Sequence, residues 1–485
     1  MSARFSLKEE SCSGVRVPAP EALPIIKPEP RDHRCGMLLF SLLLSLSLSF
    51  RSPPHSRWSA KSITLSSSKI RRLMQILLKN TTLVDTAWPQ PRHGDLLVED
   101  GLIRDFIASP NTPCLAPDCQ TIDLRGRTVL PGLIDSHVHV MASMMDLAAN
   151  AQLPTPLAIL RAASILKGML ERGFTTVRDT GGAHPALAEA ISQGLTPGPR
   201  LFTCGKALSK TGGHSDARPR YDTHDPKRWS ANAGALGRIA DGIDQVRLAC
   251  RQQLREGASF IKIMGSGGVA SPTDPIHWYG YTPDEIRAAV EECRDAHTYV
   301  AAHVYTPDTI NRAIDCGVYS LEHCNNIDAA AARRAAQARV VVVPTLVTYE
   351  ALAQDGPALG LPPASIAKIE TVRRSGLESL SILRDAGVTM AFGTDLLGPT
   401  HVRQNEEFAI RARALPARDI LTSATTIGAQ LVGMEGRLGT LAPGAIADLL
   451  VVQGNPLDDI TLLAHPEKNL FLVMKEGVIQ QRREI

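Results

Sequence analysis

The sequence predicts an α/β protein: a (β/α)8 TIM barrel with a small β-sandwich domain built from both ends of the folded chain. Eight short apolar strands recur through the middle of the 485 residues, and helical stretches follow most of them. Strand-rich runs without a long helix flank this series on both sides. Eight strand–helix repeats are typical of a closed parallel barrel, whose chemistry lies at the carboxyl ends of its strands.

Residues 1–73 differ from the rest of the chain. They are rich in Pro and Ser and carry twelve basic but only five acidic residues. Met37–Phe50 is uncharged, yet it is shorter than the about 20 apolar residues that cross a bilayer. We expect a disordered or wrongly assigned N-terminal extension, a cytoplasmic protein and no stable membrane span. A targeting segment at 37–50 is the minor alternative.

Net charge and cysteine content indicate which partners and which compartment to expect. The whole chain has a net charge of only +3, so the part after residue 73 is mildly acidic. The part after residue 73 has no cluster of basic residues that would suit a phosphate backbone, so we do not expect nucleic acid as a partner. The nine cysteines form no CxxC pair, which is typical of reduced thiols in a reducing compartment. The sequence leaves open whether the chain forms a homo-oligomer.

The small domain is expected to combine residues 74–131 with residues 436–485. QILLKNTTLVD, from residue 75, opens the first segment as a strand, and Asp100-Gly101 marks a hairpin turn. AIADLLVVQGNP and NLFLVMKEGVI near the C-terminus have the same strand pattern. The intervening residues 132–435 are expected to form the barrel.

The eight barrel strands are predicted from short apolar runs bounded by helical or turn sequence. They lie near 133–140, 175–180, 200–205, 260–266, 299–305, 319–324, 340–347 and 388–395. The connection 205–238 is long and rich in Gly, Asp and Arg, which favours an active-site loop.

Metal-competent and ionisable side chains gather at the ends of these strands. His137 and His139 are two residues apart, so both point to the same face of the first strand. The later strands add Lys262, His303, His323 and Asp395. Histidines and a carboxylate suit zinc chemistry. Singly, each histidine has a structural alternative in the core and Asp395 an alternative as a helix cap, but the shared register of all six favours a metal site.

The motifs DSHVHV, FIKIMGSGG, AAHVY, SLEH and AFGTD, in this order, resemble the amidohydrolase superfamily over essentially all of 74–485. Within it the chain looks closest to the imidazolonepropionase-related peptidases, particularly prolidases that act on Xaa-Pro dipeptides. GGVASPTDP and FGTDLLGP carry this closer resemblance, and ochratoxin-hydrolysing amidases look like cousins.

The resemblance implies two divalent metal ions, with Zn2+ expected. It implies that His137, His139 and Asp395 bind the first ion and that His303 and His323 bind the second. Lys262 is implied to bridge the two as an N6-carboxylated lysine. A shared hydroxide then attacks the amide carbonyl, and Asp395 moves the proton to the leaving nitrogen.

Loop residues are candidates for substrate contact. His214 lies in the long connection, Tyr279 follows the fourth strand, and Tyr305 directly follows the fifth. We expect Tyr281 to donate to the developing oxyanion, although a partly buried aromatic is its structural alternative. Arg218, or alternatively Arg403, is a candidate for holding a substrate carboxylate. Cys324 is expected to be an inert buried thiol.

These features favour a hydrolase that releases the C-terminal residue of an Xaa-Pro dipeptide or an N-acyl amino acid. A small peptide-like molecule is thus the expected partner. A cyclic-amide or imidazolone-type ring hydrolase, a xenobiotic amidase and a mononuclear deaminase are the enzymatic alternatives. A deaminase is disfavoured because Val304, Tyr305 and Thr306 follow His303 where related deaminases have a glutamate. A catalytically dead scaffold is disfavoured because all six ligand positions are filled.

Overall fold

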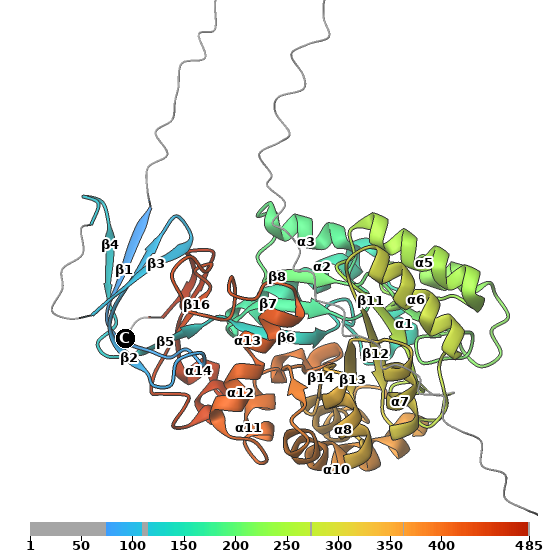
Figure 1. Cartoon of the computed structure of the whole chain (residues 1–485). Helices are drawn as coiled ribbons and strands as arrows, with labels where there is room; N and C mark the ends of the chain where they lie inside the picture. The colour runs from blue at the N-terminus through green and yellow to red at the C-terminus, as the bar shows by residue number, and fades with distance from the viewer. Residues whose placement is uncertain (1–73, 109–114, 272–273, 362, 484–485) are drawn as a thin grey trace, which may run out of the picture. The chain divides into compact units, whose positions relative to one another are not determined.

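The computed structural model describes residues 74–108, 115–271, 274–361 and 363–483 (Figure 1). The predicted N-terminal extension 1–73 and the alternative targeting segment at 37–50 lie outside these residues. Within the described part, no helix is long and apolar enough to cross a membrane.

Eight parallel strands form the barrel, at the positions that the sequence predicts. They are β6 (Leu133–Val138), β7 (Phe174–Asp179), β8 (Arg200–Thr203), β11 (Ile261–Met264), β12 (Val300–Val304), β13 (Ser320–His323), β14 (Val341–Val343) and β15 (Thr389–Met390). Backbone hydrogen bonds close the ring: Ser259 donates to Thr203 between β8 and β11, and Ser136 donates to Phe392 between β15 and β6. A closed ring brings the strand ends to one rim.

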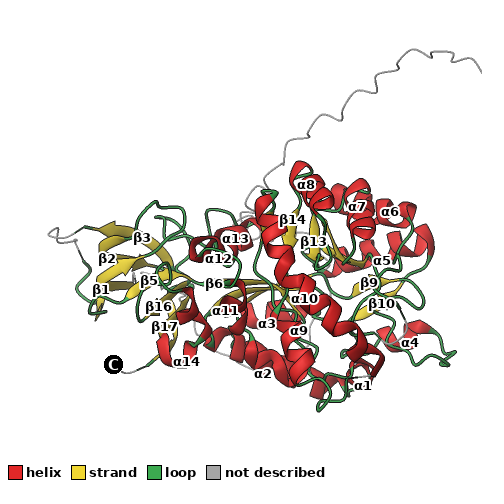
Figure 2. Ribbon diagram, turned by 90° about the horizontal axis from the view of Figure 1, so that it is seen from below, coloured by secondary structure: helices red, strands yellow, loops and turns green. Residues whose placement is uncertain are grey.

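Helices cover the outside of the barrel strands (Figure 2). The principal ones are α2 (Thr155–Glu171), α3 (Pro185–Ser192), α5 (Gly242–Glu256), α6 (Pro283–Asp295), α7 (Pro307–Asp315), α8 (Ala329–Gln337), α10 (Pro363–Asp385), α11 (Glu406–Arg411), α12 (Ala417–Ser423) and α13 (Thr426–Leu431). In α2 the buried residues Ala158, Ala162 and Leu166 recur at intervals of four, which makes one face apolar. The α6 helix starts at a capping box, in which Thr282 and Glu285 satisfy each other's backbone N–H groups.

The 205–238 connection is not a bare loop. It carries strand β9 (Ala207–Ser209) and helix α4 (Pro226–Ser230), and it leads into β10 (Gly237–Ile239). β9 pairs in parallel with both β10 and β11, so the connection is held against the barrel. Short elements also follow other strands at this rim: α1 (Leu147–Ala151), α9 (Val347–Gln354) and a 3-10 helix (Gly398–Arg403).

The two ends of the described chain share one mixed sheet of eight strands. Its strands are β1 (Gln75–Leu83), β2 (Arg92–Glu99), β3 (Leu102–Ile107), β4 (Gln120–Asp123), β5 (Thr128–Pro131), β16 (Leu449–Val452), β17 (Leu470–Lys475) and β18 (Val478–Arg482). The antiparallel pairing of β5 with β16 joins the early strands to the late ones, as the blue and red strands in Figure 1 show. A 3-10 helix (Ile460–Ala464) and α14 (Pro466–Asn469) precede β17. The predicted combination of strands from both ends of the folded chain is therefore confirmed, in the form of one mixed sheet.

Candidate metal centre

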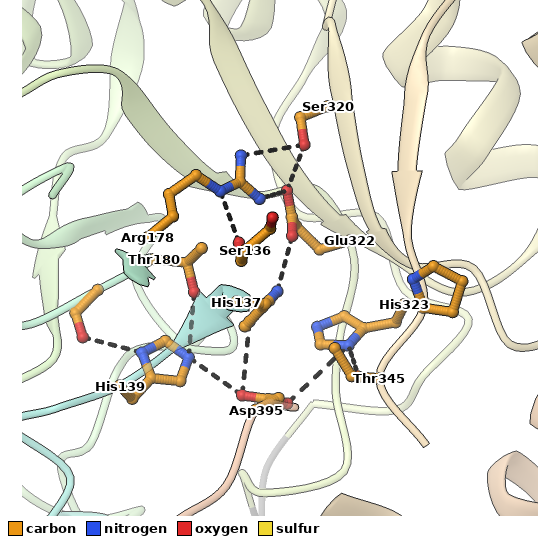
Figure 3. Close-up of polar contacts among 12 residues, drawn as sticks. Ser136, His137, His139, Arg178, Thr180, Ser320, Glu322, His323, Thr345 and Asp395 are labelled. Carbon is orange, nitrogen blue, oxygen red and sulfur yellow. Dashed lines mark hydrogen bonds and ion pairs between the residues drawn. The ribbon is translucent and has the colours of Figure 1, made fainter. Parts of the chain in front are cut away.

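His137 and His139 project from the end of β6 toward Asp395 (Figure 3). Nε2 of His137 lies 3.5 Å and Nε2 of His139 lies 3.2 Å from the same Asp395 oxygen, Oδ1. The two imidazoles enter the barrel together, as their spacing predicts. Ligand atoms of His137, His323 and Asp395 all lie within 4.8 Å of one another, close enough to share an ion.

The hydrogen bonds of these two histidines fix which nitrogens have free lone pairs. Nδ1 of His137 lies 2.7 Å from a carboxylate oxygen of Glu322, and Nδ1 of His139 lies 2.9 Å from the carbonyl oxygen of Gly181. Both partners accept, so Nδ1 must donate in each ring, and in the neutral ring Nε2 then keeps its lone pair. The buried Nε2 of His137 has no hydrogen-bond partner. Two lone pairs thus face one carboxylate oxygen, an arrangement that a bound cation stabilises.

Backbone strain sets the directions of His323 and Asp395. Both residues have positive φ angles, 73° for His323 and 55° for Asp395, and so does Cys324 at 55°. Non-glycine residues adopt this conformation at a cost and concentrate at functional sites when they do. The bend after β13 lets Glu322 and His323, adjacent in sequence, both reach the centre (Figure 3).

The ionisation of Asp395 suits a ligand. Burial opposes its negative charge, but the neighbouring imidazoles, chiefly that of His137, outweigh burial and hold the pKa of Asp395 well below its usual value. Burial lowers the pKa of His303 and of His323 well below the usual value. Both rings are therefore neutral, as metal ligands must be.

A buried ion pair that we did not predict supports His137. Glu322 accepts from His137 through one oxygen, and through the other it accepts from Arg178 at 2.7 Å and from Ser320 at 2.6 Å. Arg178 also donates to the carbonyl oxygen of Ser136 at 2.6 Å. Neither side chain of the pair is exposed. A signal existed in the sequence: an acidic and a basic residue stand inside apolar strands, where each needs a partner.

Lys262 lies on β11 among buried residues, and its own side chain is almost fully buried. Burial lowers the pKa of Lys262, against the opposing charges of Glu322 and Asp395. The charges of Glu322 and Asp395 act on this lysine, which is buried in the barrel rather than exposed at the surface.

His214 and His303 face each other across the rim. Their rings stack with centroids 4.2 Å apart and an interplanar angle of 21°. Nδ1 of His214 lies 2.8 Å from Oγ of Ser271, and the hydroxyl of Ser271 donates to buried Asp274. Gly268 makes room for this ring, because a Cβ there would lie 2.0 Å from Cε1 of His214. The long connection thus reaches the predicted ligand His303.

Tyr305 packs flat against His323, with centroids 5.3 Å apart and planes inclined by 17°. Its hydroxyl lies 2.7 Å from that of Tyr349, a residue of α9 that we did not predict. Burial raises the pKa of Tyr305, so its hydroxyl keeps its proton. Tyr349 lies in VVPTLVTYEAL, a run that also resembles the prolidases, but its helical pattern alone does not mark it as a site residue.

Other predicted substrate contacts lie elsewhere. The hydroxyl of Tyr281 donates to the carbonyl oxygen of Ala240 at 3.0 Å inside the barrel core, so its position gives no support to an oxyanion role. Tyr279 lies under the guanidinium of Arg312, 3.5 Å from the ring centroid. Arg403 is paired with Asp355 and Glu406. The sequence places these residues in the correct loops but cannot give their side-chain partners.

A cavity of about 180 Å³ opens beside the predicted ligands His139 and Asp395. His214 and Arg218 also line it. Asp395 keeps 18% of its side chain exposed there. Arg218 reaches the cavity, but Asp216 already holds its guanidinium through contacts of 2.8 and 2.6 Å. Among the described residues that line the cavity, Asp395 is the only carboxylate that also contacts the predicted histidine ligands.

Comparison with known proteins extends these observations. The model of the amidohydrolase family matches residues 128–480. Ochratoxinase from Aspergillus niger is 33% identical over 391 residues, which cover 78% of this chain and 80% of the relative. A prolidase solved in complex with N-methylphosphonate-L-proline has 47% identity and a TM-score of 0.82, covering 84% of this chain and 100% of that chain. A Xaa-Pro dipeptidase with bound methionine has 29% identity and a TM-score of 0.74 over the same shares.

The strand-end histidines, the carboxylate that faces them and the extent of these similarities lead to one assignment. The chain belongs to the amidohydrolase family, as a metal-dependent, prolidase-like hydrolase that acts on C–N bonds.

Proposed function

We propose that the protein hydrolyses the amide bond of Xaa-Pro dipeptides or of N-acyl amino acids and releases their C-terminal residue. The convergence of two imidazole lone pairs on Asp395 Oδ1 beside an open cavity carries this proposal. The N-methylphosphonate-L-proline in the complex of the 47% identical prolidase supports the dipeptide class. The ochratoxinase relative supports testing a larger amide as the second class.

The donor set fits two divalent metal ions, most simply Zn2+. His137, His139 and Asp395 would hold one ion, His303 and His323 would hold the other, and carboxylated Lys262 would supply an oxygen to each. Its lowered pKa supports this, because a neutral amine can take up CO2 whereas an ammonium cannot. When bound, such ions lower the pKa of water and polarise the scissile carbonyl.

The side chains of the protein transfer the proton and orient the substrate. Asp395 accepts the proton of the attacking water on a carboxylate oxygen and passes it to the departing nitrogen, which leaves as an amine. Its exposure to the cavity allows both transfers. His214, held by Ser271 at the cavity wall, orients the substrate, and Tyr305, protonated and held by Tyr349, packs behind His323.

A substrate panel tests the proposal. Xaa-Pro dipeptides, N-acyl amino acids, ochratoxin and cyclic amides are assayed with zinc, cobalt and manganese. We expect cleavage of Xaa-Pro or N-acyl amino acids, with the free C-terminal residue as product. Cleavage of cyclic amides alone would favour the ring-hydrolase alternative, and deaminated products would favour a deaminase.

Lys262→Ala is expected to lower both metal content and turnover. Substitution removes the oxygen donor shared between the two ions, so the purified variant should hold fewer than the about two ions per chain of the wild type. Elemental analysis alongside kcat measures this. Lys167→Ala is the control, because Lys167 is an exposed lysine of α2. A Lys262→Ala variant with full metal content and turnover would contradict the bridging role.

A further inference from the structure

The cavity beside Asp395 has a wall of mainly apolar side chains. They come from α1 and the loop before it, from α4, from the approach to β10 and from β11. They include Met145, Leu147, Ala148, Trp229, Leu236 and Met264. These elements lie far apart in the sequence, and the fold brings their apolar side chains together next to the proposed proton carrier.

Two of the charged residues in this wall, Asp216 and Arg218, neutralise each other. Asp216 accepts from Arg218 through both oxygens and from the backbone of Gly212 at 2.9 Å. The remaining arm of Arg218 donates to the carbonyl oxygen of His224 at 3.0 Å. Asp146 caps α1 through Oδ1. A charged substrate group entering here would lose water without gaining an unpaired counter-charge from Asp216 or Arg218.

We propose that this wall selects substrates that carry an uncharged apolar group, aliphatic or aromatic, on one side of the scissile amide. The proposal rests on the proposed function and specifies its substrate class. An apolar group that displaces water from such a wall gains affinity, whereas a carboxylate of similar size does not. For Xaa-Pro dipeptides, kcat/KM should therefore rise from Ala to Leu and Phe and fall for Asp.

The short helix α1 offers a sharp steric test. Ala148 is half-buried and lines the cavity, and its neighbour Ala149 is equally half-buried but does not line it. Ala148→Leu should fill the space that a large apolar group needs. Leucine is also a good helix former, so α1 should persist. Ala149→Leu adds the same volume to the same helix outside the cavity and serves as the matched control.

The experiment measures kcat/KM for Ala-Pro, Leu-Pro, Phe-Pro, Asp-Pro and Lys-Pro in the wild type and both variants. In Ala148→Leu the ratio of Phe-Pro to Ala-Pro should fall by about tenfold or more, since methylene-sized changes in apolar pockets alter specificity by about 10–200-fold. The Ala149→Leu ratio should match the wild type. A preference for Asp-Pro or Lys-Pro in the wild type, or an unchanged ratio in Ala148→Leu, overturns the proposal.

Binding separates this proposal from the proposed function. Titration calorimetry measures the affinity of the wild type and of Ala148→Leu for the same dipeptides, and so tests binding to the apolar wall separately from turnover. Tighter binding of Phe-Pro than of Asp-Pro with no cleavage of any amide would uphold the apolar wall and overturn the proposed function. Cleavage without an apolar preference would do the reverse.

Discussion

Asp395→Asn is expected to lower kcat by about 10²–10⁴-fold while the chain stays folded. The amide has nearly the shape of the carboxylate, so it fits between His137 and His139 at the end of the barrel. It cannot carry a proton from water to the departing nitrogen. The low pKa of Asp395 keeps the carboxylate ionised, and its 18% exposure leaves it accessible to accept a proton.

Turnover, metal content and thermal unfolding of Asp395→Asn are measured together. Loss of kcat with a melting temperature near that of the wild type is the expected pattern. Asp284→Asn serves as a control, because that carboxylate is 74% exposed in the first turn of α6. Wild-type turnover in Asp395→Asn would exclude the proton-carrying role.

Glu322→Ala is expected to destabilise the protein by about 3–5 kcal/mol, because it leaves Arg178 buried without its partner. Burial raises the pKa of Glu322, yet the charge of Arg178 and the hydrogen bond from His137 lower it further, so the pair is ionised in the folded state. Metal affinity should also fall by about 10–100-fold, since His137 loses the group that orients it.

The double variant Arg178→Met with Glu322→Leu separates the two effects. Replacing a buried ion pair with apolar residues of similar volume is often neutral for stability. We therefore expect recovery of the free energy of unfolding in urea but no recovery of metal affinity. Full metal affinity in the double variant would show that Glu322 does not support His137.

The strand positions were predictable because the barrel strands are apolar runs with a regular order. The strand-end residues were predictable for the same reason: parallel strands end at one rim, so His137, Lys262, His303 and Asp395 had to lie near one another. The small domain followed from strand patterns at both ends. Its single mixed sheet depends on the pairing of β5 with β16, a contact between distant residues that periodicity does not encode.

Side-chain partners were not predictable from the sequence. Tyr281 stands close in sequence to the loop after β11, but the turn into α6 directs its hydroxyl to Ala240. Arg218 lies in the predicted long connection, but its guanidinium is paired with the carboxylate of Asp216, two residues away. The pair of Arg178 and Glu322 joins strands 144 residues apart. Each of these outcomes depends on the direction of a side chain in the folded barrel.

The pairing of β5 with β16 has a consequence for synthesis on the ribosome. The edge of β5 (Thr128–Pro131) that pairs with β16 stays uncovered until Leu449–Val452 has been synthesised. At about 5–20 residues per second, more than 300 residues of translation leave that edge open for roughly 15–60 s. During this interval the nascent chain offers an unpaired strand beside β6, the strand that carries His137. A premature stop codon shortly before residue 449 would therefore leave the whole barrel translated but β5 without this neighbour.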